Sequence, residues 1–484
     1  MKVLTQLIND LFENLTNSIL SAGTKDNLLK ASFAKKKSLL SPKHSGFAIG
    51  LDAFTIEQSH SHLMCCAPSS GGKTTKVILP SIFQIATSAE QGSMVVNDVK
   101  NEIYPKVKPF LLSQGYTVLK LDFRDPANSI AFNPFSYALA PTELNKICNL
   151  LAGEEQQGSD PFWRQQAVNL INTIATYLKK HEDVKYQNIA NIHYILEHLA
   201  AEEDTINNLY SQNAENDLWL RYKTLHANSE RTKASIISSA ISYLSHYALD
   251  ADICDVTSSP NSFNFSRLKS EKIALFISLP IHNNGYYTRL IGMFFDIMFN
   301  HLFSDVSTPN SRKLYVIIDE LAQIPLKKFE DIISIARSYF AILFVVQSTE
   351  QLYEKYGQHG GNVILNNCTG IYFTGLRHES QMLQELCGSY NYYPDVKNKN
   401  NIQQRHLLSA QEVRTMPKDN ALIVPNGGLK PIYIKNVKPW YKVRKYIEYV
   451  NMINPDEFAL PLPHQRYRTK YLPLDAYRNN DEQQ

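Results

Sequence analysis

The chain has 484 residues, of which 44% are hydrophobic and 20% are charged, and this ordinary globular composition excludes disordered, collagen-like and coiled-coil classes. The 49 Lys and Arg residues nearly balance the 46 Asp and Glu residues, which excludes a protein that coats nucleic acid with its whole surface but allows a local basic channel. The six cysteines show no metal-binding spacing, so we expect reduced thiols and a cytoplasmic location.

The N-terminal residues 1–44 are predicted to form an amphipathic helix followed by a lysine-rich linker. The helix is expected either to pack on the body of the protein or to lie on an anionic membrane surface. No stretch of the chain reaches the roughly 18 consecutive apolar residues of a spanning helix, and no signal peptide precedes it. We therefore expect a protein without a transmembrane segment.

Short apolar runs alternate with helical segments from residue 45 onward, and two later runs near residues 421–424 and 431–434 are also predicted strands. Because the earlier runs show little alternation of apolar and polar residues, they are typical of parallel strands buried on both faces, which predicts an α/β fold. The predicted strands of this kind are residues 63–66, 93–97, 117–121, 273–279, 314–318, 342–346 and 370–373.

The alternation stops over residues 141–249, where helical periodicity predicts an all-α insertion domain. One α/β domain would then be built from residues 45–140 and 250–440. Trp163 stands near the start of the insertion and is expected to be a core aromatic. An Asn/Lys-rich loop is predicted at residues 393–404, and residues 441–484 are predicted to be a weakly structured C-terminal tail.

A phosphate-binding loop is predicted at residues 67–74, APSSGGKT, between a strand and a helix. The pattern G-x-x-x-x-G-K-[ST] is met except that Ala67 replaces the first glycine. Lys73 is expected to contact the β- and γ-phosphates of ATP, and the Thr74 hydroxyl to bind Mg²⁺. The residues predicted to bind the nucleotide are Ala67, Pro68, Ser69, Ser70, Gly71, Gly72, Lys73, Thr74 and Thr75.

Two further strands end in polar residues that would complete such a site. The strand at residues 314–318 is followed by Asp319 and Glu320, the pattern of a Walker B strand. We expect Asp319 to hold the Mg²⁺ ion and Glu320 to polarise the attacking water. The strand at residues 342–346 is followed by Gln347, a candidate sensor of the γ-phosphate.

At these motifs the sequence resembles the TraG family of type IV secretion coupling proteins, which are conjugative ATPases. Nine segments in the same order, spanning about residues 45 to 435, carry the resemblance. They are APSSGGKT (67–74), VVNDVKNE (95–102), AFNPF (131–135), DPFW (160–163), DELA (319–322), ARSY (336–339), QSTEQL (347–352), YG (356–357) and NNC (366–368).

The resemblance implies a RecA-like P-loop NTPase domain interrupted by an all-α domain, assembled as a homo-hexamer with ATP sites between subunits. It implies that single-stranded DNA, bound without sequence specificity and attached to a relaxase, or an effector protein, is brought to a type IV secretion channel. Arg337 matches the family arginine that reaches a neighbouring subunit's nucleotide. Asp98, Lys100 and Glu102 match a motif expected near the ATP site or the pore.

Family members usually carry transmembrane helices before the nucleotide domain, and none is predicted here. Membrane contact is therefore expected only through a partner or at the periphery, at the cytoplasmic face of the inner membrane. Two alternative functions are also compatible with a P-loop NTPase core. A duplex-DNA translocase of the FtsK/HerA type shares the core but lacks such a helical insertion, whereas a nucleotide-gated docking adaptor with little ATPase activity would be compatible with it.

Overall fold

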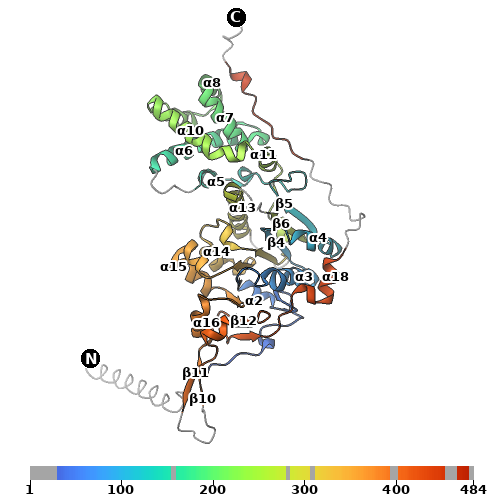
Figure 1. The fold of residues 1–484 in the computed structure, drawn as a ribbon. Helices are drawn as coiled ribbons and strands as arrows, with labels where there is room; N and C mark the ends of the chain where they lie inside the picture. The colour runs from blue at the N-terminus through green and yellow to red at the C-terminus, as the bar shows by residue number, and fades with distance from the viewer. Residues whose placement is uncertain are drawn as a thin grey trace, which may run out of the picture.

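The computed structural model describes residues 30–153, 160–278, 284–305, 311–392, 402–452 and 466–478. The predicted N-terminal helix lies outside these residues. The molecule is elongated, with a cluster of helices at one end and a small β-hairpin at the other (Figure 1). Within the described residues, no helix combines the length and the apolar character that crossing a bilayer requires.

A nine-stranded sheet forms the centre of the molecule, in the order β13-β12-β9-β3-β8-β7-β4-β6-β5. The seven strands from β9 to β5 are mutually parallel, and β12 and β13 are added antiparallel at one edge. The strands are β3 (Leu63–Cys66), β4 (Ser93–Asp98), β5 (Thr117–Leu121), β6 (Ile273–Ser278), β7 (Leu314–Ile318), β8 (Ala341–Val346), β9 (Thr369–Tyr372), β12 (Ala421–Val424) and β13 (Ile432–Ile434). The predicted α/β class with a mainly parallel sheet is confirmed.

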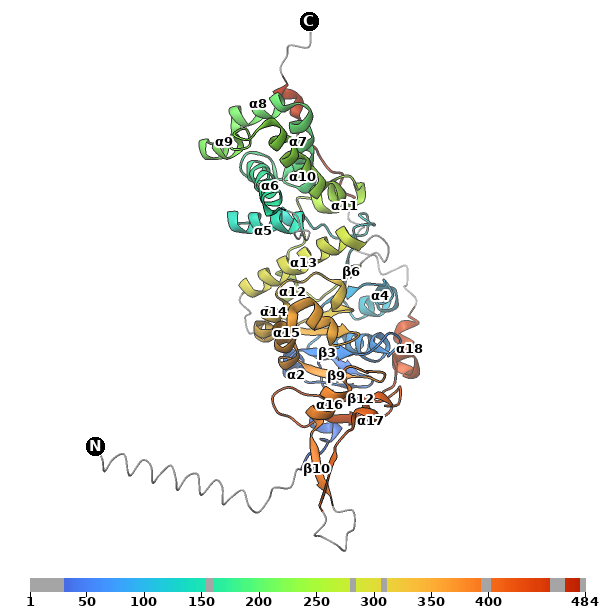
Figure 2. The same ribbon diagram turned by 60° about the vertical axis from the view of Figure 1, so that its left-hand side comes forward.

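Two small antiparallel pairs lie outside the central sheet. Strands β1 (Ala48–Ile49) and β2 (Asp52–Ala53) form one pair. Strands β10 (Ser389–Tyr392) and β11 (Gln403–His406) form the hairpin at the end of the molecule (Figure 2). The predicted loop at 393–404 was therefore too long at its end, because Gln403 and Gln404 pair with β10; residues 393–401 lie outside the described part.

Helices cover both faces of the sheet and bury two separate apolar clusters, because most strand residues are apolar on both sides. One face carries the π-helix η2 (Thr74–Ile78), α3 (Leu79–Thr87), α4 (Tyr104–Ser113) and α18 (Arg444–Val450). The other carries α12 (Arg267–Ser270), α13 (Asn284–Ser304), α14 (Phe329–Ile335), α15 (Glu350–Asn366), α16 (Glu379–Cys387) and α17 (Ala410–Arg414). Helix α2 (Ile56–His60) precedes β3 and contacts β8.

The helical insertion stands between β5 and β6, as predicted, and its apolar core is continuous with the α13 face of the sheet. Its helices are α5 (Pro141–Ala152), α6 (Pro161–His181), α7 (Ile189–Ala201), α8 (Glu203–Asn213), α9 (Asn216–Lys223), α10 (Glu230–Ala248) and α11 (Ala251–Ser258). Trp163 is not the core aromatic that we expected. It is 37% exposed and packs edge-on against Phe162, because the buried face of α6 begins only at Ala167.

Short 3-10 helices occur at several connections. They are η1 (Lys36–Ser38), η3 (Pro134–Tyr137), η4 (Val184–Tyr186), η5 (Leu321–Gln323), η6 (Ala336–Ser338), η7 (Trp440–Lys442) and η8 (Leu474–Tyr477).

The described part of the C-terminal region is packed on the molecule, in contrast to the weakly structured tail that we predicted. Tyr446 of α18 is fully buried, and Tyr449 stacks on Phe110 of α4 with ring centroids 4.2 Å apart. Residues 466–478 then lie along the helical insertion (Figure 1). The prediction was wrong because aromatic and basic residues without periodicity give no sign of the surface on which they pack.

Candidate nucleotide-binding site

All predicted site residues except Arg337 follow strands at one edge of the sheet, because β3, β8, β7 and β4 are parallel neighbours in that order. The carboxyl ends of parallel strands lie at the same edge, where ligands bind in open α/β sheets. Residues 67–73 follow β3, Asp319 and Glu320 follow β7, and Gln347 follows β8. Strand β8 separates the phosphate loop from the Walker B strand, so Gln347 lies between them.

The phosphate loop has the backbone shape of an anion-binding turn. Ser70 and Gly72 have positive φ angles of 65° and 92°, which turn successive N–H groups toward one point. A Cβ atom on Gly71 would stand 2.8 Å from the Cβ of Ala67, so only glycine fits there. Ala67 is buried and its φ is not positive, so the backbone freedom of the usual glycine is not required at this position.

Helix η2 begins at Thr74, one residue after Lys73, so the loop leads directly to a helix N-terminus that favours negative charge. The Thr75 hydroxyl donates to the Gly72 carbonyl at 3.2 Å and holds the loop to the helix. Lys76 is buried and pairs with Asp419 at 3.0 Å. The sequence motif alone gave no indication of this ion pair, because its two residues are far apart in the chain.

The positive charge of Lys73 acts on the carboxyl group of Asp319. Burial raises the pKa of the Asp319 carboxyl to about 6, the nearby Lys73 ammonium opposes this rise, and the charges of Glu320 and Asp98 add to it. Burial likewise raises the pKa of the Cys65 thiol to about 12, again opposed by Lys73. The site is thus a partly desolvated cluster in which the lysine charge lies close to a carboxylate.

Glu320 has a left-handed backbone with φ of 74°, which is uncommon for a residue with a side chain. Its carboxylate accepts a hydrogen bond from Nε2 of Gln347. The amide oxygen of Gln347 accepts in turn from the Ser69 hydroxyl at 3.3 Å. Gln347 therefore connects the phosphate loop with the acidic residue of the Walker B strand.

Asp98 ends β4, the strand beside β7. Its carboxylate accepts hydrogen bonds from the backbone N–H groups of Glu102, Ile103 and Tyr104 at 2.8 to 3.0 Å, which fixes the start of α4. Burial raises the pKa of Asp98, and these three hydrogen bonds oppose the rise. The acidic residue of this motif thus positions the chain at the edge of the site.

Arg337 is not close to the phosphate loop of its own chain. It lies in η6, just before β8 begins, and therefore at the amino edge of the sheet. The six residues of β8 separate it from the opposite edge by about 20 Å at the rise of an extended strand. Its side chain is 62% exposed beside Glu57 at 4.0 Å, and its carbonyl contacts Nδ1 of His60 at 2.9 Å.

Two charged residues, the half-buried Lys355 and the buried Glu379, support the site and were missed from sequence. Nζ of Lys355 in α15 donates to the carbonyls of Leu321, at 2.9 Å, and of Ile324, in the turn after Glu320. Glu379 accepts from the backbone N–H of Thr349 at 2.7 Å, two residues after Gln347. Neither residue belongs to a recognisable spacing, so no local pattern identifies it.

The residues present fit a nucleotide with Mg²⁺. The loop has no room for side chains at Gly71 and offers backbone N–H groups, a lysine and a hydroxyl to phosphate oxygens. Mg²⁺ bound with a nucleotide commonly takes one or two carboxylates together with phosphate and water oxygens, and Asp319 and the Thr74 hydroxyl offer oxygens of this kind.

Solved structures with the same fold include those of the bacterial conjugative coupling protein TrwBdeltaN70. The unbound form matches 85% of this chain and 95% of that chain, with 15% identity and a TM-score of 0.64. TrwB in complex with ADP and Mg²⁺ matches with 15% identity and a TM-score of 0.63, over 85% of this chain and 95% of that one. Its complex with the ATP analogue ADPNP covers the same shares, with 14% identity and a TM-score of 0.63.

These likenesses establish the fold. No curated protein sequence matches the chain. The family model described as "Type IV secretory system Conjugative DNA transfer" matches residues 19–470, which is nearly the whole chain. The protein therefore belongs to the conjugative DNA-transfer family of type IV secretory systems, the family of the TraG-type coupling proteins.

Proposed function

We propose that the protein is an ATP-hydrolysing coupling protein that recruits relaxase-bound single-stranded DNA, or a protein, and helps drive it into a type IV secretion channel. The observation that best supports the proposed ATPase activity is the pair of hydrogen bonds that Gln347 forms with Ser69 and Glu320. It connects a phosphate-binding element with an acidic residue that could activate water, which is the arrangement an NTP-hydrolysing site requires.

The chain's own groups would divide the work of phosphoryl transfer. Lys73 would neutralise charge on the β- and γ-phosphates, and Thr74 and Asp319 would hold Mg²⁺, which supplies further charge neutralisation. Glu320 would polarise the water that attacks the γ-phosphate in line, with its carboxylate aimed by Gln347. Arg337 would stabilise the transferring group from a neighbouring copy, because it stands at the far edge of its own sheet.

We propose that the copies assemble as a homo-hexameric ring. An exposed arginine at one edge of the sheet can reach a phosphate loop at the other edge when copies are arranged head to tail, and such an arrangement forms a ring when the rotation between copies closes. DNA would be gripped through its phosphates inside that ring, without sequence specificity. A ring that feeds a channel across the inner membrane would work at the cytoplasmic face of that membrane.

The site assignment is tested by the steady-state ATPase activity of Lys73→Ala and Glu320→Gln. Both variants should fold and should lose hydrolysis, and Glu320→Gln should still bind nucleotide. Lys37→Ala and Glu448→Gln, which change exposed residues, are the matched controls. A folded Lys73→Ala protein that hydrolyses ATP at the normal rate would contradict the assignment.

Stimulation by DNA and the state of assembly test the coupling role. ATPase activity that rises with single-stranded DNA, in a protein that forms rings on it, supports the proposal. Stimulation by duplex DNA alone would favour the FtsK/HerA type of translocase. A monomer that binds ATP and ignores DNA would favour a docking adaptor.

A further inference from the structure

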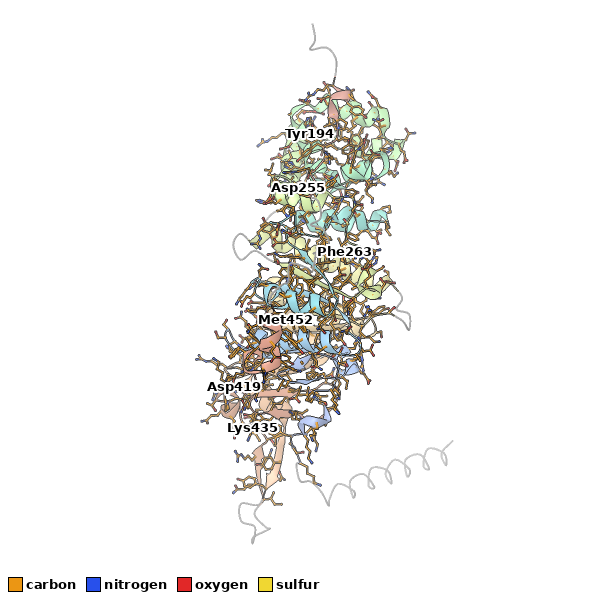
Figure 3. All side chains as sticks on the ribbon, turned by 90° about the vertical axis from the view of Figure 1, so that its right-hand side faces the viewer. Tyr194, Asp255, Phe263, Asp419, Lys435 and Met452 are labelled. Atoms are coloured by element: carbon orange, nitrogen blue, oxygen red, sulfur yellow. The ribbon has the colours of Figure 1, made fainter. Side chains whose placement is uncertain are left out.

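The segment 466–478, called the strap below, lies on the helical insertion. It contacts α7, α8 and α11, and the surface of these helices beneath the strap is called the groove below. In Figure 3 the chain leaves the sheet near Met452, and Asp255 and Tyr194 mark the surface that the strap meets. Its contacts have the character of peptide binding.

Asn191 of α7 forms hydrogen bonds with the backbone of the strap. Its Nδ2 donates to the carbonyl of Lys470 at 2.8 Å, and its Oδ1 accepts from the N–H of Leu472 at 2.8 Å. One side-chain amide thus pairs with both backbone groups of an extended segment. Asn191 is fully buried, and its Nδ2 also donates to Oδ1 of Asn188 at 3.0 Å. Residues of the groove therefore fix the orientation of the Asn191 side chain.

Two more side chains of the groove also bind backbone atoms. Oδ1 of Asp255 accepts from the N–H of Thr469 at 3.1 Å, and Nδ2 of Asn208 donates to the carbonyl of Tyr477 at 3.0 Å. Asp255 is only 6% exposed. Since backbone groups are common to all sequences, these contacts would accept many extended segments.

Side-chain selectivity comes from a small number of positions. Leu472 and Leu474 are buried at 3% and 1% exposure, and the residues beside them are exposed. Arg466 donates to Asp255 at 2.6 Å and to Asp252 at 2.8 Å. The groove therefore selects a cation and, six and eight residues later, two apolar side chains of an extended chain.

A cavity of about 490 Å³ lies beside Tyr467 of the strap. It is lined mainly by the segments after β5 and after α11, and Asp255 is shared between this cavity and the groove. A larger side chain at the position of Tyr467 would find space there.

We propose that this groove is a binding site for an extended polypeptide of the pattern Arg-x5-Leu-x-Leu, and that the strap occupies it in cis as a resident competitor. The connection through residues 453–465 gives the strap an effective concentration of about millimolar order. A foreign segment binds when it outcompetes the strap or when the strap is displaced. The site lies apart from the nucleotide edge, so this inference goes beyond the proposed function.

The test uses full-length chains and a fluorescent peptide with the sequence of residues 464–478. In the variant Leu472→Asp/Leu474→Asp the strap should leave the groove, because two buried leucines become charged. Fluorescence anisotropy should then show saturable binding of the peptide. Binding to the unaltered chain should be at least about tenfold weaker, because the tethered strap competes.

Control peptides define the specificity. A peptide that keeps Arg, Leu and Leu at their spacing but changes the other positions should bind within about threefold of the original, because the other contacts are to backbone. The same peptide with Asp in place of both leucines should not bind. Lys73→Ala in the displaced-strap background should bind normally, which separates this inference from the ATPase assignment.

A folded displaced-strap variant that does not bind the peptide would overturn the proposal, and so would equal affinity of the variant and the unaltered chain. If the variant does not fold, hydrogen exchange on the unaltered chain decides. Millimolar spacing-matched peptide should then speed the exchange of the Thr469 and Leu472 amides, and unchanged protection would count against the site.

Discussion

Gln347 donates a hydrogen bond from its side-chain amide to the carboxylate of Glu320, across the gap between two neighbouring strands. The same amide accepts from Ser69 in the phosphate loop. A change in the loop, as on loss of the γ-phosphate, can therefore reach Glu320 through one side chain. In the proposed function, Gln347 would therefore connect nucleotide sensing with water activation by Glu320.

Replacing Gln347 by Ala should lower kcat for ATP by about 10- to 100-fold, because Glu320 would lose the group that orients it. Nucleotide affinity should change by no more than about threefold, since the phosphate loop and Lys73 remain. Steady-state kinetics and titration with a fluorescent ADP analogue measure the two quantities. Gln411→Ala, on an exposed face of α17, is the control. A loss of affinity with unchanged kcat would assign Gln347 to binding instead.

Arg337→Ala should abolish ATPase activity without affecting nucleotide binding, because the side chain stands at the far edge of its own sheet. Mixing Arg337→Ala with Lys73→Ala should restore activity. In a randomly mixed ring, about a quarter of the interfaces would combine an intact loop with an intact arginine. Arg444→Ala, which changes an exposed arginine of α18, should keep its ATPase activity without mixing. If mixed rings form and remain inactive, Arg337 does not act between subunits.

Lys355→Ala should weaken the turn that follows Glu320, because the carbonyls of Leu321 and Ile324 lose their charged donor and keep only the backbone N–H donors of Ile324, at 3.3 Å, and Leu326, at 2.8 Å. A hydrogen bond from a charged donor contributes about 1.5 to 3 kcal/mol. We expect a lower Tm together with a kcat reduced by about tenfold. Glu354→Ala, at the exposed neighbouring position, should change neither. A lower Tm with unchanged kcat would show that Lys355 supports the fold alone.

Asp296→Asn in α13 should stabilise the protein at neutral pH. Burial raises the pKa of Asp296 to about 6, so its ionised form is disfavoured in the folded chain. Because the folded pKa lies above the unfolded value of 3.8, stability is lost as pH rises from about 3.8 to about 6.

The gain at pH 8 should reach up to about 3 kcal/mol and should vanish near pH 3.5. Thermal unfolding of the variant and the parent across this range measures it. Asp183→Asn, with a carboxylate 72% exposed, should show no such dependence. A gain that is equal at both pH values would exclude titration of Asp296 as its cause.

Much of the fold and of the candidate site was predictable because both depend on local patterns. Buried parallel strands are short apolar runs, and the phosphate loop and the Asp319–Glu320 pair are motifs within a few residues. Parallel pairing then requires that polar residues after such strands meet at one edge. The positions of Lys73, Asp319, Glu320 and Gln347 around one edge follow from that geometry.

Other features depend on pairs of residues far apart in the chain. Lys355 beneath the turn after Glu320, the burial of Tyr446 on the sheet and the contact of Asn191 with Leu472 have no periodic pattern. Trp163 was misplaced for the same reason, since apolar character alone does not say which turn of a helix is covered.

The sequence by itself determined the α/β class and the helical insertion, and it identified the motifs that follow β3 and β7, because hydrophobic periodicity and short motifs act over a few residues. Only the tertiary structure decided which chain segments cover which surfaces, and it placed the strap in its groove and Arg337 away from its own phosphate loop. The physical reason is that individual polar contacts between distant residues are selected by the folded backbone, which brings their partners within hydrogen-bond distance.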